Sequence, residues 1–461
     1  MKQNVYTGVL ETLSPVFIGN GGEYSPTMDF IEEDGAIAFL NEKKVIEGMP
    51  ESELEEFLSY LKIKQQNDPS SLREFFKRVK IPYEPFVSRR VSKKGIVRST
   101  EVKSHLKTKG KFPIVPGSTL KGAFRTALLE AHDIYKREAV RQKSFTGSDV
   151  ECPFLGFSDT DPGLEEDLCI FVCRRWHVKK ENRLPLIFEA IQPGMKYLMK
   201  MTFEPERGEI VSGKRLFNSI EEIIKAVKSF TKKNVQREVA FMKKHKTEEI
   251  QKVTLFYHEL IKEMEGLKEN EAIFRIGMGK TFWDNTILKE EDWALYQNTF
   301  GKVKPRKDIF PITRTLTFNG SFYEWPLGWV KLTIQPPEEL TARIRKRFQE
   351  RQQQDEERNR EEREEEKRQK EEELRRQQEQ EMLKKMTDFE KELYLMENEK
   401  QAEEQERLAG ELFKKLDSFN EEHQKKAAES LKKVYEQAEK WSGAQSKKQK
   451  AKVETIKKIL E

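Results

Sequence analysis

PGSTLKGAFRTAL, residues 116–128, joins a turn to a helix with one apolar face. Pro116 and Gly117 favour the turn. The hydroxyl of Ser118 or Thr119 can then accept a hydrogen bond from a free N–H group of the first helical turn. Apolar residues recur at helical spacing and predict a stripe that faces a core: Leu120, Phe124, Ala127, Leu128 and Ala131.

Two cations of this helix, Lys121 and Arg125, are four residues apart and project from the same side. Free N–H groups, the positive end of the helix dipole and two cations together predict a phosphate site. The alternative is a capped core helix whose two cations are only solvated. The residues alone leave both interpretations open.

Five segments resemble the motifs of the RAMP superfamily, the repeat-associated proteins of CRISPR effector complexes. The helix above resembles the G-S-[ST]-[LI]-[KR]-G-x-[LIF]-R motif. The other four segments are TLSPVFIGNGG (12–22), EAIQPG (189–194), RIGMGKTFWDNTI (275–287) and PLGWVKL (326–332). Their order and spacing match over about 330 residues. Phe17 stands where many relatives carry His, so no function is carried over to that position.

Periodicity alone predicts an α+β fold. The resemblance implies two ferredoxin-like (RRM-like) RAMP units, residues 1–210 with insertions and residues 211–340 with the glycine-rich loop. The PLGWVKL strand resembles one branch, the subunit that caps the 3′ end of CRISPR RNA in type III-A (Csm) effectors. The branch implies a non-catalytic subunit that binds CRISPR RNA and is needed for its maturation and for antiviral defence. The implied partners are CRISPR RNA, other Csm subunits, especially the neighbouring backbone RAMP, and a host nuclease that trims the RNA.

The expected RNA contacts lie in the glycine loops, the 116–128 helix and a basic segment. Residues 88–111 carry nine Lys and Arg residues against one acid, Glu101, which favours contact with phosphates over a flexible solvated loop. In the 275–287 segment, Arg275 and Lys280 are expected to meet phosphates. The full set of expected contacts is Gly19, Gly21, Gly22, Arg89, Arg90, Lys93, Lys94, Arg98, Gly117, Ser118, Thr119, Lys121, Arg125, Arg275, Gly277, Gly279 and Lys280.

The glycine-rich 275–287 segment lacks the spacing of a Walker loop. In the RAMP context its glycines would allow close approach of the backbone to RNA. Phe282 and Trp283 could stack on bases. A core anchor is the favoured alternative for Trp283.

No residue set for catalysis or for a metal or cofactor stands out. An RNase of the same fold is the second hypothesis, with Asp29 in a loop and His105 or His132 near the basic segment as its candidates. Cys169, Cys173 and His177 could suggest a metal, but LCIFVCRRWHV has the composition of a strand. Residues four apart on a strand are separated by about 13 Å, which is too far to share one ion.

The C-terminal quarter has a different composition from the rest. Residues 341–461 hold 31 Lys and Arg and 31 Asp and Glu, so the net charge of +5 lies entirely before them. Residues 349–373 contain no apolar side chain, which predicts a solvated charged helix over 341–385 rather than a core element or coiled coil. Apolar stripes return in 386–461 and predict a small helical bundle. A third hypothesis is therefore a scaffold protein that acts through this tail.

Three cysteines in 461 residues provide no disulfide framework, which fits a reducing compartment. No apolar stretch follows Lys2 and no segment approaches 18 apolar residues, so we expect neither a secretion signal nor a membrane span. The expected location is the cytoplasm.

Overall fold

The computed structural model describes residues 4–64, 72–97, 100–109, 111–131, 152–178, 185–207, 210–211, 214–215, 217–286, 311–399, 401–442 and 446–461. The chain forms two compact units, Met1–Gln352 and Gln353–Glu461. The fold is mixed α and β, as the sequence predicts, with all the long strands in the first unit.

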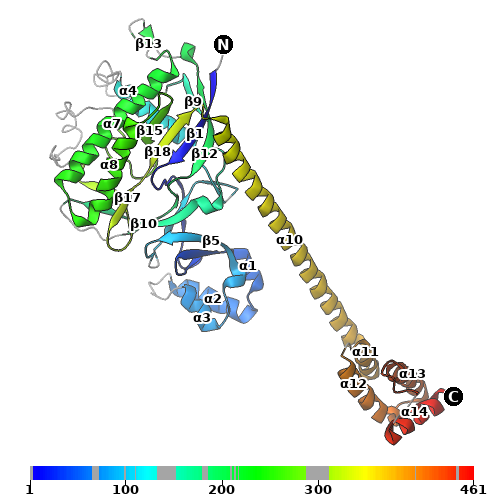
Figure 1. Ribbon diagram of the computed structural model, residues 1–461. Helices are drawn as coiled ribbons and strands as arrows, with labels where there is room; N and C mark the ends of the chain where they lie inside the picture. Colours follow the sequence, from blue (N-terminus) through cyan, green and yellow to red (C-terminus); the bar gives the residue numbers. More distant parts are fainter. Residues whose placement is uncertain are drawn as a thin grey trace. The chain divides into compact units, whose positions relative to one another are not determined.

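One antiparallel sheet of the first unit places the N-terminal strand in its middle. The strand order is β15-β18-β1-β12-β9. Their bounds are Glu271–Arg275 (β15), Trp329–Ile334 (β18), Asn4–Thr12 (β1), Lys196–Phe203 (β12) and Leu155–Phe157 (β9). Three helices lie along this sheet in Figure 1: α4 (Gly117–Ala131), α7 (Ile220–Lys244) and α8 (Gln251–Glu265).

The second sheet has the order β2-β6-β11-β10-β5-β4-β3, and β16 and β17 extend it from β10. The bounds are Gly19–Tyr24 (β2), Phe30–Glu32 (β3), Ala36–Leu40 (β4), Val87–Lys94 (β5), Val102–His105 (β6), Leu168–His177 (β10), Pro185–Ile191 (β11), Thr313–Phe318 (β16) and Tyr323–Pro326 (β17). Two small two-stranded sheets pair β7 (Lys107–Thr108) with β8 (Phe112–Pro113) and β13 (Ile210–Val211) with β14 (Lys214–Arg215).

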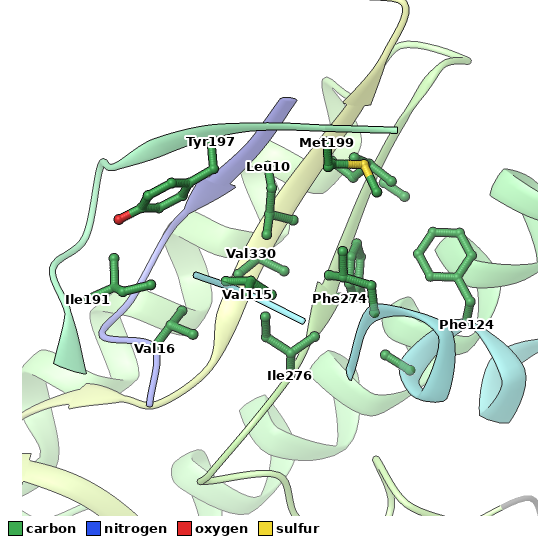
Figure 2. Packing of buried hydrophobic residues seen from close by; sticks show 14 of the residues in the cluster. Leu10, Val16, Val115, Phe124, Ile191, Tyr197, Met199, Phe274, Ile276 and Val330 are labelled. Carbon is green, nitrogen blue, oxygen red and sulfur yellow. The ribbon is translucent and has the colours of Figure 1, made fainter. Parts of the chain in front are cut away.

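The main core lies between the first sheet and helices α4 and α7, and it continues into the second sheet. Phe124 of α4 packs edge-on against Phe274 of β15, with ring centroids 5.0 Å apart. Figure 2 shows Val16, Val115 and Ile276 directed into this same core. Four residues of the predicted apolar stripe, Leu120, Phe124, Ala127 and Leu128, are buried, which confirms the stripe. The fifth, Ala131, is exposed because it is the last residue of α4.

A satellite core lies under three short helices that follow β4. These are α1 (Glu42–Gly48), α2 (Glu51–Lys64) and α3 (Leu72–Val79). Phe57, Phe75 and Phe76 are buried among them. Apolar periodicity predicts helices over residues 51–63 and 69–79, where α2 and α3 lie. It predicts none over α1, in which only Val45 of the seven residues is buried.

Helix α10 runs without interruption from Glu338 to Lys385. Its first turns belong to the first unit, where Arg347 pairs with Asp167 at 2.7 Å and Arg351 pairs with Glu166 at 3.2 Å. A cavity of about 600 Å³ remains between these turns and the segment around Tyr197. The first compact unit thus includes the residues of α10 up to Gln352.

The second unit has a core of its own. It is built by α11 (Asp388–Asn398), α12 (Ala402–Lys414), α13 (Glu421–Gln437) and α14 (Lys447–Leu460). Met396, Leu412, Leu431 and Ile456 are buried at its centre. Among the described residues of the whole chain, we find no helix that is long and apolar enough to cross a membrane.

Two expectations about loops are wrong. Residues 19–24, expected as a glycine loop, form β2 and pair with β6, with a shift in register between Gly19 and Glu23. The basic segment 88–111 is largely strand, since β5 and β6 each pair with neighbours inside the second sheet. A strand can carry alternating cations on its outer face, so basic composition alone does not distinguish a strand from a loop.

Candidate nucleic-acid interface

All five motif segments meet around residues 12–19. Val16 forms a backbone bridge with Ile191 of the EAIQPG segment. Phe17 O accepts a hydrogen bond from Met278 N of the glycine-rich loop at 2.9 Å, and Pro15 O accepts one from Gly328 N of PLGWVKL at 2.8 Å.

The fifth segment is reached through a neighbouring loop. Ile18 O accepts from Leu106 N at 2.8 Å, and Leu106 O accepts from Ile114 N at 3.3 Å, two residues before the PGSTLKG helix. Segments that lie about 310 residues apart in the sequence are thus joined by backbone hydrogen bonds into one substructure, which we call the motif hub: residues 12–19, 105–117, 191–194, 276–280 and 327–329.

The glycines of the 276–280 loop permit contact between backbones of the protein itself. Gly277 has φ +63°, and a Cβ there would lie 2.3 Å from Phe17 O. Gly279 has φ +95°, and a Cβ there would lie 2.6 Å from Leu327 Cβ. These two glycines are therefore needed for hub packing, which is a different use from the expected approach to RNA.

Of the three glycines of β2, Gly21 has open surroundings, whereas a Cβ at Gly19 would lie 3.2 Å from the Phe17 ring and one at Gly22 would lie 3.1 Å from Asn20 Oδ1. Strand β2 is the edge of the second sheet, and Gly19, Gly21 and Gly22 are exposed. Gly21 has φ +85°, and no atom lies within 4 Å of a Cβ built there. The sheet edge at Gly21 is thus open enough for another backbone to approach closely.

The N-terminus of α4 already has an anionic partner. Asp159 Oδ1 accepts a hydrogen bond from Gly117 N at 2.8 Å. The prediction that Ser118 or Thr119 caps the helix is wrong, because both lie inside its first turn. A Cβ at Gly117 would lie 2.2 Å from Phe157 O, so the helix start packs against the end of β9.

The two cations of α4 remain on the side away from the core. Lys121 and Arg125 are half-buried on the polar side of the helix, whose Gly122 is exposed. Among the ion pairs of the described residues, Lys121 forms none. Since Asp159 neutralises the positive end of the helix, these side chains rather than free N–H groups are what α4 offers to a phosphate.

Most cations of the basic segment are paired with acids from other strands. Arg90 pairs with Glu33 at 3.0 Å, and Lys93 pairs with Glu32 at 2.5 Å. Lys103 pairs with Glu23. Glu101 is thus not the only acid that balances the segment. In the described part of the chain Lys94, Lys109 and Lys111 form no ion pair, and Lys94 and Lys109 are exposed. Arg98 and His132 lie outside the described residues.

Arg89 belongs to a buried ionic network centred on Glu189, in the middle of β11. Arg89 Nη2 lies 2.6 Å from Glu189 Oε1, and Lys107 Nζ lies 2.5 Å from Glu189 Oε2. Tyr24 OH accepts hydrogen bonds from both cations, at 3.1 and 2.6 Å. Burial would raise the pKa of Glu189, but Arg89 and Lys107 outweigh burial and hold that pKa below its ordinary value.

His105 lies beside this network and is fully buried. Its Nδ1 accepts from Ile18 N, and its Nε2 lies 3.3 Å from Ile114 O, which fits a neutral ring that donates from Nε2. Burial lowers the pKa of His105 to about 4. Both ring nitrogens are used inside the motif hub, so the structure gives His105 a packing role rather than access to a substrate.

Asp29, the other candidate for catalysis, closes its own turn. Its Oδ2 accepts from Ser25 N at 2.6 Å, and its N–H donates to Ser25 O. Among the described residues no group of three or more His, Cys, Asp or Glu is arranged to hold a metal ion. Cys169 and Cys173 are buried in strand β10, as the strand prediction for this segment requires.

Arg275 is buried, in contrast to the expectation that it meets phosphates. Its Nε donates to Leu327 O at 2.8 Å, and its Nη1 lies 3.3 Å from Asp284 Oδ2. Asp284 also accepts from Thr281 N at 2.7 Å. This pair therefore holds the glycine-rich loop to the rest of the motif hub.

The aromatic residues after the loop follow the favoured alternative. Trp283 is 4% exposed, so it anchors the core, while Phe282 is half-buried. Lys280 is half-buried. Burial lowers the pKa of Lys280, Asp284 opposes this effect, and Arg275 adds to it.

Sequence reasoning missed two residues that organise the site, Asp159 and Glu189. Glu189 had a signal, since a carboxylate inside the apolar run LIFEAI needs a buried cation as partner. Asp159 had none, because only the fold brings β9 to the start of α4.

Comparisons with known proteins agree with the motifs. The family model described as the RAMP superfamily matches residues 9–443. A protein described as "CRISPR system Cms protein Csm5" from Methanocaldococcus jannaschii is 23% identical over 380 residues, covering 70% of this chain and 88% of its own length.

Two solved structures match about 70% of this chain. A chain of the cryo-EM structure of a Csm–crRNA–target RNA ternary complex, from a type III-A CRISPR-Cas system, has a TM-score of 0.54 and 21% identity, covering 71% of this chain and all of its own. The crystal structure of T. onnurineus Csm5 has a TM-score of 0.49 and 20% identity, covering 70% of this chain and 99% of its own.

Proposed function

This chain belongs to the RAMP superfamily, and on that premise we propose that it is a CRISPR-RNA-binding subunit of a type III-A Csm effector that caps the RNA 3′ end. The observation that carries the proposal is the motif hub, in which all five motif segments meet. The similarity to a Csm5 protein over 88% of that protein's length favours the capping branch. In this role the chain supports maturation of CRISPR RNA and antiviral defence in the cytoplasm.

The finer architecture belongs to the same proposal. The two ferredoxin-like units would be residues 1–210 and 211–340, each of which contributes strands to both sheets. Residues 341–385 would be a charged stalk and 386–461 a helical bundle. The partners would be CRISPR RNA, the neighbouring backbone RAMP and other Csm subunits, and a host nuclease that trims the RNA.

The RNA surface that we propose combines an open edge with unpaired cations. The exposed glycines of β2 allow a sugar–phosphate backbone to approach the sheet edge. Lys94, Lys109 and Lys121 supply positive charge that the described acids do not neutralise. Arg90, whose side chain is 48% exposed, can exchange its carboxylate partner for a phosphate at small cost, because exposed ion pairs contribute only about 0 to 1 kcal/mol. The Lys93 side chain is only 12% exposed, so exchange of its partner Glu32 would cost more.

Arg89, Lys107 and Arg275 have a different role in this proposal. Their carboxylate partners Glu189 and Asp284 are buried. If the cations moved to a phosphate, each carboxylate would remain as an unpaired charge away from water, at a high cost in free energy. They position the strands and loops that contact the RNA. Gly277, Gly279 and Gly117 do the same through close packing.

The test is RNA binding by the full chain over a range of salt concentrations. Lys121→Ala/Arg125→Ala should weaken binding to unrelated single-stranded sequences alike. It should also reduce the slope of log affinity against log salt by about 1.4, which corresponds to two lost phosphate contacts at about 0.7 each. Lys43→Ala/Lys44→Ala makes the same change in charge on α1, outside the motif hub, and should leave the slope unchanged.

Two results would contradict this function. One is a sequence preference that added salt does not alter, because phosphate contacts carry no sequence information. The other is cleavage of a guide precursor or a complementary target that disappears in Asp29→Ala or His105→Ala. That result would favour the RNase hypothesis.

A further inference from the structure

The last helix of the chain, α14, is rich in unpaired cations. Its sequence KKQKAKVETIKKIL contains six lysines and one glutamate. Among the ion pairs of the described residues, none involves a lysine of α14. Elsewhere in the second unit lysines commonly have carboxylate partners, as in Lys391–Asp388, Lys415–Glu392, Lys426–Glu422, Lys432–Glu436 and Lys440–Glu406.

Three lysines, Lys414 of α12, Lys440 after α13 and Lys448 of α14, lie close enough to Lys452 of α14 to repel its charge. Lys452 lies over the rings of Phe413 and Tyr435, with its Nζ 5.3 and 6.0 Å from their centroids. Burial lowers the pKa of Lys452, and repulsion from three neighbouring lysines lowers it further. We call these four residues the lysine cluster: Lys414, Lys440, Lys448 and Lys452.

Only Lys440 of the lysine cluster has a described carboxylate partner, Glu406 at 2.5 Å. Like charges that are held together raise the free energy of the folded chain unless a counter-charge relieves them. The exposed α14 residues Lys447, Lys450, Lys457 and Lys458 extend the same positive field. The surface is therefore suited to a ligand that carries several negative charges in a row.

The apolar side of α14 cannot serve as the binding surface. Val453 and Ile456 are buried in the core of the unit, so the helix has no free apolar face to insert into a lipid surface. Among the described residues of this unit, the exposed large apolar side chains are Leu374, Met382 and Leu395, all on α10 or α11. A protein partner would need a well-exposed apolar anchor on α12 to α14, whereas the described apolar side chains that reach the surface there, such as Phe413, Trp441 and Leu460, are partly buried against the core of the unit.

We propose that the lysine cluster, together with α14, binds the phosphate backbone of a single-stranded nucleic acid as a second site of this chain. Lysine ammonium groups act as point charges on phosphates and need no shaped pocket. The site lies in the second compact unit and uses no residue of the motif hub. This second site can therefore be tested independently of the function proposed above.

The experiment counts binding sites on the full chain with short probes. An eight-nucleotide oligonucleotide is titrated in RNA and DNA form at low salt, and bound copies are counted by native mass spectrometry. We expect two copies per wild-type chain. The variant Lys414→Glu/Lys448→Glu/Lys452→Glu should lose the site in the second unit and bind one copy. The variant Lys121→Glu/Arg125→Glu should lose the site in the first unit and also bind one copy.

Two further variants control for charge and folding. Lys367→Glu/Lys370→Glu/Lys384→Glu makes the same change in net charge on exposed positions of α10 and should still bind two copies. Replacing Lys414, Lys448 and Lys452 by Gln largely keeps the length of these side chains and removes their charge. It should weaken the second site about tenfold, with an unchanged circular dichroism spectrum.

The outcomes separate the two proposals. If the cluster variant binds as many copies as wild type, the lysine cluster is not a nucleic-acid site. If wild type binds one copy and only the cluster variant loses it, the site in the second unit is supported and the RNA-binding function proposed for the first unit is contradicted. Binding of poly-glutamate at the cluster without binding of either oligonucleotide would assign an acidic protein and overturn the inference. Comparing the RNA and DNA arms identifies which sugar the site accepts.

Discussion

Gly277 and Gly21 both adopt left-handed backbone, yet only one of them is surrounded by protein. The sequence predicted that glycines matter in both segments, and it could not tell which glycines face the chain itself.

The same limit applies to charge. Counting acids along residues 88–111 finds only Glu101, whereas Glu23, Glu32 and Glu189 reach the segment across strands. Local composition predicts neither the surroundings of these glycines nor the acidic partners of these cations, because both depend on which strands become neighbours.

Gly277→Ala should destabilise the first unit far more than Gly21→Ala. Both variants place alanine at positive φ, at a cost of about 1 to 2 kcal/mol. At Gly277 the new Cβ would also lie 2.3 Å from Phe17 O, so the loops of the motif hub must separate. We expect a total of about 3 kcal/mol or more at Gly277, and only the backbone cost at Gly21. Urea unfolding of the two variants measures the difference, and equal midpoints would contradict it.

His105 should make the first unit sensitive to mild acid. The unfolded chain protonates this ring near its ordinary pKa of about 6.5, whereas the folded chain does so only near pH 4. Between these values the unfolded state binds more protons. Stability therefore falls as pH falls, by a total of about 3 kcal/mol.

His105→Gln can keep both hydrogen bonds without titrating. It should lose less stability than wild type between pH 7.5 and pH 4.5, when urea midpoints are compared. An identical loss in both proteins would assign the acid sensitivity to other groups.

At the scale of elements, the sequence predicted most strands and the longer helices, because their apolar periodicity is strong. It did not predict where α10 attaches. Residues 338–352 show few apolar positions, so their contacts were invisible to a pattern of hydrophobicity. Their attachment is ionic and aromatic instead. Arg347 reaches the buried Asp167, and Phe348 packs edge-on against Phe112 at 6.0 Å.

Arg347→Gln should destabilise the first unit in the full chain, because it leaves the Asp167 carboxylate without its cation. We expect a loss of about 1 to 3 kcal/mol. Arg345→Gln removes a charge two residues away on the same helix and should have little effect, since Arg345 is exposed. Thermal unfolding compares the two variants.

A pair of truncations tests the same attachment. A chain that ends at Gln352 should keep the midpoint of the first unit, and one that ends at Pro337 should lose several degrees. Equal midpoints would show that the first turns of α10 do not stabilise the unit.

At the scale of the whole molecule, the motifs identified the superfamily because they are local and their order is distinctive. The sequence could not say that they converge, since convergence depends on pairing across the full length of the first unit. It also could not assign the tail. Charges of both signs occur along it, and only the folded unit shows that the lysines of α14 lack described carboxylate partners while several lysines of neighbouring helices have them.

If the chain caps the RNA 3′ end, each effector complex should contain one copy of it. Repeating subunits must present the same surface at every step. A helix of 48 residues, about 70 Å long, would be hard to accommodate on each copy of a tight array. Native mass spectrometry should show one copy per guide RNA for guides of different length. Copies that increase in number with guide length would assign the chain to the backbone branch.

The central place of β1 in its sheet has a consequence for how the protein is made. One neighbour of β1 is β12 and the other is β18, which is translated more than 300 residues later. At a translation rate of about 5 to 20 residues per second, β18 is synthesised roughly 15 to 60 s after β1, and one side of β1 stays unpaired during this time. Its backbone groups stay available for wrong pairings during that time. We expect slow completion of folding and a benefit from chaperones that shield nascent strands, with the motif hub assembled only after Gly328 has emerged.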